Sequence, residues 1–287
     1  MNKLALGTVQ FGMRYGINKN NIFKQSEISE ILKIAQLNKI NTLDTAIAYG
    51  NSEVRLGRED IKNFNVISKI PKILIEKDID KWVEKSIDES LKKLNKNQLY
   101  GILIHDIEDL NKNYSDLLYK TLIKLKEEKK VKKIGVSIYS PCDLDHIVNN
   151  FDIDIVQSPF SIFDRRLDSS GWMKRLTDRN IEIHVRSIFL QGLLLMNSNE
   201  IPKKFKNWRN LFKQWDRETS KTGICKIGAC LQFVLSQDSI SKVVFGVDNI
   251  SQLNEIINKS HLTTKYKLSD FSCEDESLLN PSMWKNL

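Results

Sequence analysis

The stretch that decides the fold runs from Leu43 to Glu53 and reads LDTAIAYGNSE. Residues 41–46 are apolar and β-branched enough to form a buried strand, and Asp44 lies where that strand should end. Tyr49 follows on the next loop, and a Gly-Asn pair interrupts the chain before a helix begins. In an α/β protein, an acid at a strand end with a phenol just beyond it is typical of a functional site.

The helix after this loop should begin at Ser52. A serine hydroxyl can accept a hydrogen bond from the free N–H groups of a first helical turn, so we expect Ser52 to cap this helix. Glu53 then places negative charge in the first turn, where the helix dipole favours it. The stretch therefore predicts one strand–loop–helix unit.

The same unit recurs along the whole chain. Further strand-like runs lie at residues 4–8, 65–70, 100–105, 134–137, 153–157, 181–186 and 242–245. Apolar residues recur at helical spacing within 28–35, 79–94, 118–125, 143–149, 172–176, 227–235 and 250–258, and a long connection includes 203–221. Eight such units predict an α/β protein with a (β/α)8 TIM barrel, a single domain over residues 1–287. An open doubly wound sheet would favour a GxGxxG turn after the first strand, and the sequence has none there.

The composition is that of an ordinary globular protein, with 41% hydrophobic and 28% charged residues. The formal net charge is +8, but the lysines are scattered, and the densest run, at 124–133, also contains two glutamates. We therefore do not expect nucleic-acid binding. A basic surface would also suit an anionic cofactor or substrate.

The four cysteines form no CxxC pair and have no histidine at metal-ligand spacing, so we expect reduced thiols and no metal site. The first residues lead directly into a strand and do not resemble a signal peptide. No apolar run approaches the roughly 20 residues needed to span a bilayer. We expect a soluble, cytoplasmic protein that is a monomer or a weak homo-oligomer and does not bind membranes.

Four polar residues lie where the second, third and fourth strands end: Asp44, Tyr49, Lys69 and His105. In a TIM barrel these ends converge on one mouth. The phenol has an ordinary pKa of about 10, which a nearby ammonium would lower, and the carboxylate would keep that ammonium charged. The imidazole can hold a substrate oxygen near the phenol. Singly, such residues are more often solvated groups or loop anchors, but their ordered occurrence favours a catalytic set.

With these residues in place, the chain resembles the aldo-keto reductase family. The resemblance extends over nearly the whole chain in the family's order. The matching pieces are LGT at 6–8 with FG at 11–12, DTA at 44–46, YGNSE at 49–53, Lys69 after VIS, His105 after LI, IGVS at 134–137, Gln157, GLL at 192–194, and Gly246 with Gln252 and Glu255.

The resemblance implies an oxidoreductase in which Tyr49 gives a proton to a small carbonyl substrate, with Asp44, Lys69 and His105 assisting. It also implies a nicotinamide cofactor, NADPH with NADH possible, lying extended across the barrel mouth. The residues that it assigns to this cofactor are Ser137 and Gln157 on the carboxamide, with Arg186, Ser187, Gly192, Gly246, Gln252 and Glu255 along the remainder.

The chain departs from the family pattern at several of these positions. Ile138 replaces an asparagine found in many members, and Ile256 replaces an asparagine expected near the adenine. Arg186 replaces an aromatic residue that stacks on the nicotinamide, and its planar guanidinium can stack instead. Gly246 and Gln252 stand where some members have basic residues on the 2′-phosphate. We therefore predict NADPH binding with only modest discrimination against NADH.

Two other functions remain open from the sequence. One is a nicotinamide-binding regulatory or sensor subunit with little turnover, and the other is a barrel hydrolase that uses paired carboxylates. The hydrolase lacks a convincing second acid at the strand ends. Candidates for an apolar or sugar-stacking substrate wall are Phe11, Tyr15, Phe160, Phe189 and Trp284.

Overall fold

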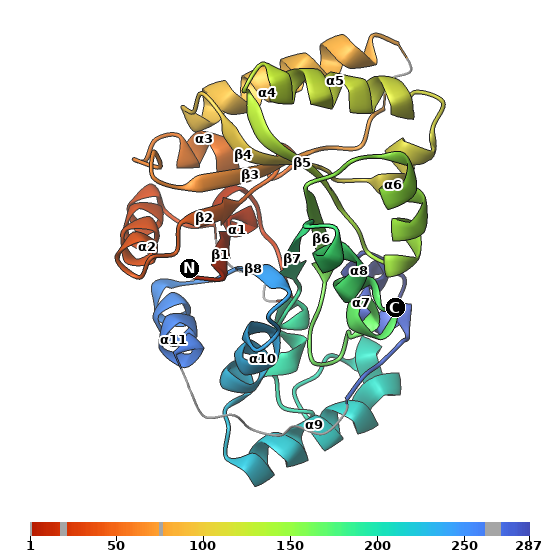
Figure 1. Ribbon diagram of the computed structural model, residues 1–287. Coiled ribbons are helices and arrows are strands. Elements are labelled where there is room, and N and C mark those ends of the chain that lie inside the picture. Colours follow the sequence, from red (N-terminus) through yellow and green to blue (C-terminus); the bar gives the residue numbers. More distant parts are fainter. Residues whose placement is uncertain (1, 18–21, 75–76, 262–270) are drawn as a thin grey trace.

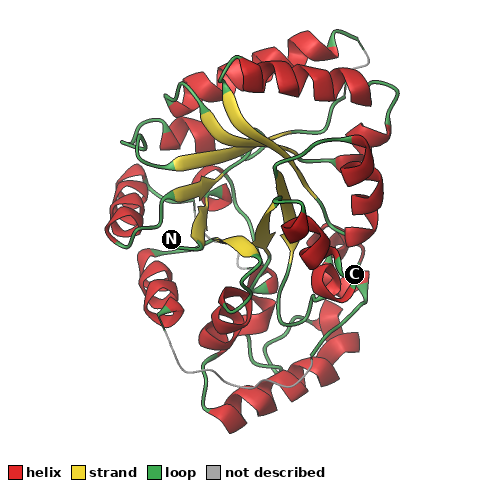
Figure 2. Cartoon of the chain, in the orientation of Figure 1, coloured by secondary structure: helices red, strands yellow, loops and turns green. Residues whose placement is uncertain are grey.

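Eight parallel strands pair in chain order and close into a barrel, with β1 paired to both β2 and β8. The computed structural model describes residues 2–17, 22–74, 77–261 and 271–287. The strands lie at the centre and the helices surround them (Figures 1 and 2). The strands are β1 Leu4–Gly7, β2 Thr42–Asp44, β3 Asn65–Ile70, β4 Leu99–Ile104, β5 Val131–Ser137, β6 Ile155–Pro159, β7 Glu182–Arg186 and β8 Ile240–Phe245. The predicted (β/α)8 barrel is confirmed.

The helices alternate with the strands as predicted, and α9 and the short helices α1, α7 and α12 are additional. They are α1 Val9–Gly12, α2 Gln25–Leu37, α3 Ser52–Leu56, α4 Ile79–Leu94, α5 Ser115–Glu127, α6 Leu144–Asn150, α7 Arg166–Ser169, α8 Trp172–Asp178, α9 Arg209–Thr222, α10 Lys226–Leu235, α11 Ile250–Ser260 and α12 Glu276–Leu279. Short 3-10 helices are η1 Ile107–Asn111, η2 Pro141–Asp143, η3 Leu190–Leu195, η4 Lys203–Trp208 and η5 Pro281–Asn286. The segment predicted as a connection at 203–221 thus contains α9. This helix was missed because it is strongly polar and buries little beyond Phe212, Trp215 and Thr219.

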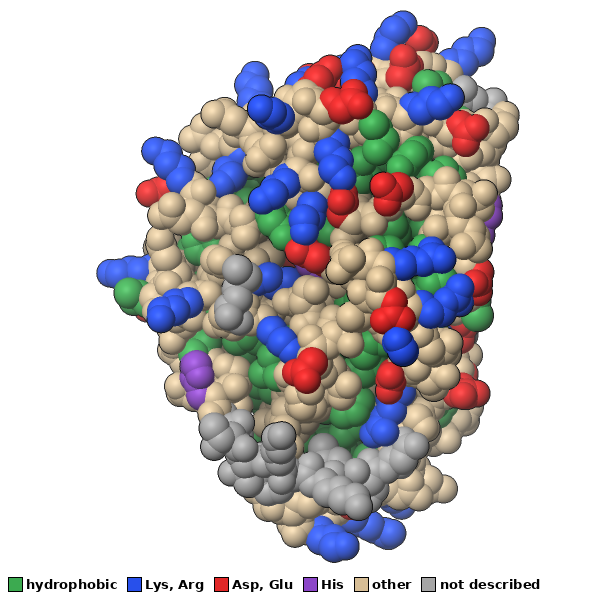
Figure 3. Space-filling view, viewed as in Figure 1, with side chains coloured by type: hydrophobic (Ala, Val, Ile, Leu, Met, Phe, Trp, Pro, Cys, Tyr) green, Lys and Arg blue, Asp and Glu red, His purple; other side chains and the backbone are tan. Residues whose placement is uncertain are grey.

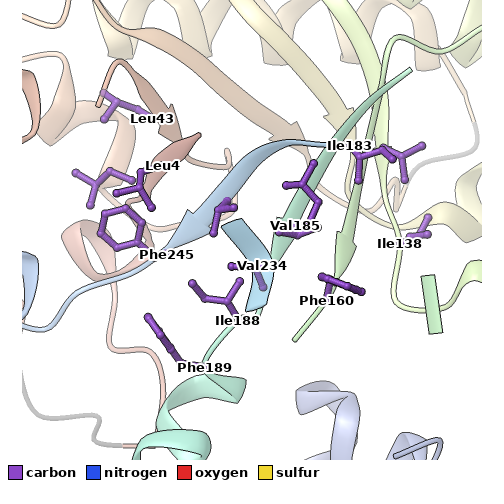
Figure 4. Close-up of a cluster of buried hydrophobic side chains, with 14 of the residues drawn as sticks. Leu4, Leu43, Ile138, Phe160, Ile183, Val185, Ile188, Phe189, Val234 and Phe245 are labelled. Carbon is purple, nitrogen blue, oxygen red and sulfur yellow. The ribbon is translucent and has the colours of Figure 1, made fainter. Parts of the chain in front are cut away.

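The main core lies between the barrel strands and the surrounding helices. Ile183 and Val185 of β7 belong to this core together with Val234 of α10, and all three are fully buried (Figure 4). Because side chains alternate along a strand, the neighbouring residues of β7 face the barrel interior. Glu182 accepts a hydrogen bond of 2.8 Å from the hydroxyl of Tyr100 on β4, a strand that is not its neighbour, so these side chains meet inside the barrel.

The barrel interior is filled in layers. Near the strand starts, Glu182 also accepts from Lys133 Nζ at 2.6 Å and contacts His184 Nε2 at 3.1 Å. These hydrogen bonds hold the pKa of Glu182 at about 2, although burial opposes them. Ile67, Leu103 and Ile155 form a separate buried apolar cluster. Two residues further along β3 and β6 the interior becomes polar again, and this is the mouth of the barrel.

Candidate active site

A buried ion pair lies at the mouth between the ends of β2 and β3. Lys69 Nζ lies 2.7 Å from Asp44 Oδ2 and donates a second hydrogen bond of 2.9 Å to the carbonyl oxygen of Thr45. Lys69 is only 1% exposed. Burial lowers the pKa of Lys69, and the charge and hydrogen bond of Asp44 oppose that change. A buried ammonium needs such partners to remain charged, so the pair holds Lys69 in one position.

The side chain of Gln157 connects this ion pair to the opposite side of the mouth. Its Nε2 donates to Asp44 Oδ1 at 2.6 Å, and its Oε1 accepts a longer bond of 3.5 Å from Ser137 Oγ. The register of β5 and β6 places Ser137 and Gln157 side by side. The sequence assigned both residues to the cofactor and missed the bond to Asp44. A glutamine inside an otherwise apolar strand was the available signal.

Tyr49 and His105 complete the group above the ion pair. Lys69 Nζ lies 5.3 Å from the centroid of the Tyr49 ring. The Tyr49 and His105 rings meet edge to face, with their centroids 6.0 Å apart. The structure therefore brings together all four residues that the sequence singled out as catalytic.

The protonation states of these two rings follow mainly from burial. The pKa of Tyr49 is raised, first by burial and then by the Asp44 carboxylate, and the charge of Arg186 only partly opposes this. The expected lowering of the phenol pKa by a neighbouring cation is therefore wrong in its net direction. Burial, followed by the charges of Lys69 and Arg186, lowers the pKa of His105 to about 4. At neutral pH both rings are uncharged and can donate hydrogen bonds.

The loop that carries Tyr49 is held by α1 and by the start of α3. A Cβ atom on Gly12 would lie 1.9 Å from the carbonyl oxygen of Tyr49, so the two backbones touch at this point. The expected cap by Ser52 is wrong, because the N-cap is Asn51 and the Ser52 hydroxyl donates instead to the carbonyl oxygen of Thr8 at 2.9 Å. This bond ties the loop to the end of β1.

Glu53 lies in the first turn of α3, as predicted. It is also 2% exposed and accepts hydrogen bonds of 2.7 Å from the hydroxyls of Ser68 and Ser90. Ser68 belongs to β3 and Ser90 to α4, so this carboxylate joins three elements behind the mouth. Its role is thus structural as well as electrostatic.

Arg186 ends β7 and points its guanidinium across the mouth. One terminal nitrogen donates 2.9 Å to the carbonyl oxygen of Ile138, and the other lies 3.4 Å from the hydroxyl of Ser187. The guanidinium carbon lies 4.4 Å from the centroid of the Tyr139 ring, a distance typical of cation–π stacking. No role was predicted for Tyr139, although it lies two residues after the end of β5.

The connection after β7 contains several residues with positive φ angles. Ser187, Gln191 and Gly192 have positive φ angles of 59°, 51° and 97°. Left-handed residues within a turn can direct successive N–H groups to one side, which creates a concave site for a phosphate. In this loop, however, the N–H groups of Leu190 and Gly192 donate to the carbonyl oxygens of Ser187 and Phe189 at 2.8 and 2.9 Å, so these two donors are already engaged.

The residues assigned to the adenosine end lie on β8 and α11. Gly246 is packed against Gln10, since a Cβ atom there would lie 2.7 Å from the side-chain nitrogen of Gln10. Gln252 Oε1 accepts a hydrogen bond of 2.7 Å from the backbone N–H of Asp248. Glu255 lines a cleft of about 530 Å³ together with Lys226, a volume within the usual range of ligand pockets. Of the three residues assigned to the adenosine end, only Glu255 lines this cleft.

Most of the aromatic candidates for a substrate wall are buried in the core. Phe11, Phe160 and Trp284 are at most 5% exposed and belong to the core, and Phe189 is nearly as buried. Only Tyr15 is exposed, and its hydroxyl accepts a hydrogen bond of 3.0 Å from Gln191. Aromatic residues in loops cannot be separated from core residues by sequence alone, because both interrupt polar segments in the same way.

The surface adds little to the site. Lys and Arg side chains are spread over the face seen in Figure 3, with Asp and Glu between them. Within the described ranges, no three His, Cys, Asp or Glu residues are grouped so that they could hold a metal ion. None of the helices that the structure describes is both long and apolar enough to cross a membrane.

A closed eight-stranded barrel with this polar mouth defines a TIM-barrel protein with an enzyme-like site. The model of the Aldo/keto reductase family matches residues 3–272, and the chain belongs to this family of NAD(P)H-dependent oxidoreductases. The family expected from the sequence is confirmed.

Individual relatives are distant. The "uncharacterized oxidoreductase YqkF" of Bacillus subtilis (strain 168) is 25% identical over 193 residues, which is 63% of this chain and 60% of that relative. The match thus spans less than two thirds of the relative's length. The holo form of the aldo-keto reductase AKR11C1 from Bacillus halodurans has a TM-score of 0.75 at 18% identity, over 92% of this chain and 88% of that one. The glycerol dehydrogenase AKR11B4 from Gluconobacter oxydans has a TM-score of 0.72 at 20% identity, with the same shares covered. Both of these structures have the same fold as this chain.

Proposed function

We propose that this protein reduces an aldehyde or a ketone to the alcohol with NADPH or NADH, and that Tyr49 donates the proton. The observation that carries the proposal is the buried Asp44–Lys69 pair beneath a neutral Tyr49 and beside a neutral His105. Family membership supports the reaction class. The substrate is a small carbonyl compound, either simple or derived from a sugar.

The bound nicotinamide supplies the hydride that adds to the carbonyl carbon. The carbonyl oxygen gains negative charge during this addition, and Tyr49 donates its phenolic proton to that oxygen. An alkoxide is a stronger base than a phenolate, so the proton moves favourably even from a phenol with a raised pKa. A raised pKa also keeps Tyr49 protonated before the substrate arrives.

The surrounding residues position this transfer. His105 is neutral at pH 7 and can donate a hydrogen bond to the carbonyl oxygen, which directs that oxygen toward Tyr49. The Lys69 ammonium stabilises the phenolate that remains after transfer. Asp44 holds Lys69, and Gln157 holds the second oxygen of Asp44. Asp44 and Gln157 are therefore positioning residues.

The test combines binding and chemistry. The protein is titrated with NADPH and with NADH while its tryptophan fluorescence is followed, and is then assayed with small aldehydes, keto acids and sugar-derived carbonyls. We expect binding of both cofactors and their oxidation by at least one class of carbonyl. Tight binding without oxidation across the panel would instead support a regulatory subunit. Hydrolytic activity in the absence of nicotinamide would support the hydrolase.

A further inference from the structure

Among the described residues, the guanidinium of Arg186 has only neutral partners. They are the carbonyl oxygen of Ile138, the hydroxyl of Ser187 and the ring of Tyr139. Among the residues that the structure describes, no carboxylate forms an ion pair with it. Arg186 is nevertheless half-buried at the mouth of the barrel, where water screens a charge less than at an open surface.

The acid of the catalytic group is not available to this arginine. One oxygen of Asp44 pairs with Lys69 and the other accepts from Gln157, both at short distances. The Asp44–Lys69 pair is neutral as a whole, and His105 is uncharged at pH 7 because its pKa is about 4. Of the described charges among Asp44, Lys69 and Arg186, that of Arg186 is therefore the one without an opposite charge paired to it.

The guanidinium is also held in a form that can bind an acid. An arginine side chain has five N–H donors arranged as a planar fork. The described contacts use two terminal nitrogens, and the Tyr139 ring lies 4.4 Å from the guanidinium carbon, so three neighbours hold the group in place. A fixed fork loses little conformational entropy when a carboxylate or a phosphate binds to its remaining donors.

Arg186 is close enough to act on the reacting groups. Its charge lowers the pKa of Tyr49, and it also lowers the pKa of Tyr15, Lys69 and His105. A group bound to Arg186 would thus lie in the same cavity mouth as the proton donor.

We propose that Arg186 is the receptor for an acidic group of the substrate, so that this site reduces carbonyl compounds that carry a carboxylate or a phosphate. The inference rests on the proposed reductase function and specifies its substrate class. It replaces the stacking of Arg186 on the nicotinamide that the family resemblance suggests. The neutral wall of Tyr139 and the charge of Arg186 then serve substrate selection.

The test uses pairs of substrates that differ in the acidic group. Succinic semialdehyde is compared with butanal, and glyceraldehyde phosphate with glyceraldehyde, at saturating reduced cofactor. We expect kcat/KM to favour the charged member of at least one pair by about tenfold or more, as for a charge-assisted hydrogen bond. The first pair reports on carboxylates and the second on phosphates.

Variants then locate the receptor. In Arg186→Gln the ratio of kcat/KM for charged over neutral substrate should fall by at least about tenfold, and Arg186→Lys should restore part of it. The matched control is Arg175→Gln, which removes the same charge from an arginine paired with Asp145 at 2.9 Å. The control should keep the parental ratio. An equal loss on both members, with weaker cofactor binding, would place Arg186 on the cofactor and overturn the proposal.

A binding measurement separates this inference from the reductase function. γ-Hydroxybutyrate and butanediol are titrated by calorimetry into the protein saturated with reduced cofactor, where neither can be oxidised. Tighter binding of the acid, lost in Arg186→Gln, would support the receptor even if no carbonyl were reduced. Equal binding of the acid by the parent and Arg186→Gln would overturn the receptor while leaving the reductase proposal intact.

Discussion

Single residues at the mouth owe their chemistry to burial. Tyr49 keeps its proton because its pKa is raised by burial and by Asp44, so it can act as a donor but not as a ready base. Lys69 faces the opposite tendency, since burial lowers its pKa, and it depends on Asp44 to remain charged. Tyr49 is therefore a neutral acid, and Lys69 is a cation held in position beside it.

Tyr49→Phe should lower kcat by about 10²–10⁴-fold, the usual contribution of a positioned proton donor. Within the described residues, the Tyr49 hydroxyl makes no hydrogen bond, so stability and cofactor binding should change little. Steady-state kinetics together with fluorescence titration of the cofactor measure both effects. A variant that reduces a good substrate at the parental rate would rule out Tyr49 as the donor.

His105 should make stability depend on pH. Its pKa is about 4 in the folded protein and about 6.5 when unfolded, so between these values the unfolded chain binds the proton more tightly. Stability contributed by the neutral ring is thus present above about pH 6.5 and is lost as the pH falls toward 4. Between about pH 7.5 and 5 the parent should lose about 1–2 kcal/mol more unfolding free energy than His105→Gln. Urea unfolding at both pH values measures this, and equal losses would show that the ring is not held neutral.

At the scale of elements, the active loop depends on the contact between α1 and α3. A methyl group in Gly12→Ala would lie 1.9 Å from the carbonyl oxygen of Tyr49 and 2.4 Å from the backbone nitrogen of Ser52, so the loop must move. We expect a loss of about 1–3 kcal/mol in stability and at least about a tenfold loss in kcat. Thermal unfolding and kinetics test this, with Met13→Ala, at a 39% exposed neighbour, as control. A Gly12→Ala variant with parental activity and stability would show that the loop can accommodate this methyl group.

The strand β7 shows how one element serves two purposes. Glu182, His184 and Arg186 share the interior face, and the first two belong to the network at the base of the barrel. Arg186 is the next interior position and reaches the mouth. The period of two along a strand therefore places a structural acid and the proposed anion receptor on the same row.

At the scale of the whole molecule, cofactor choice depends on two segments far apart in sequence. Gly246 and Gln252 have uncharged side chains, so neither offers a charge to a 2′-phosphate, and Gln252 Oε1 is already bonded to the N–H of Asp248. A charge-assisted hydrogen bond contributes about 1.5–3 kcal/mol, so its absence can remove a tenfold preference. We predict dissociation constants for NADPH and NADH within about tenfold of each other at one ionic strength. A ratio beyond about a hundredfold would mean that the adenosine end lies elsewhere.

The sequence alone was sufficient for the barrel and for the convergence of its four mouth residues. Eight alternating units predict the topology, and closure of parallel strands then brings the carboxyl ends together wherever the exact strand limits fall. The strand at 65–70 begins and ends as predicted, while other ends shift by one to three residues without moving Asp44, Lys69 or His105 from the mouth. The helix α9 was missed because it is polar overall, although its three buried residues, Phe212, Trp215 and Thr219, recur at helical spacing.

Only the tertiary structure decided how these residues are connected. The bond from Gln157 to Asp44 joins positions 113 residues apart, and no local pattern specifies which side chain an inward-facing amide will meet. The net direction of the Tyr49 pKa depends on burial, which outweighs the nearby positive charge and is a property of the closed barrel. The same holds for Arg186, around whose guanidinium β5 and the loop after it place neutral groups in the described part of the chain. Local periodicity determines where a side chain points, and long-range packing determines what it meets there.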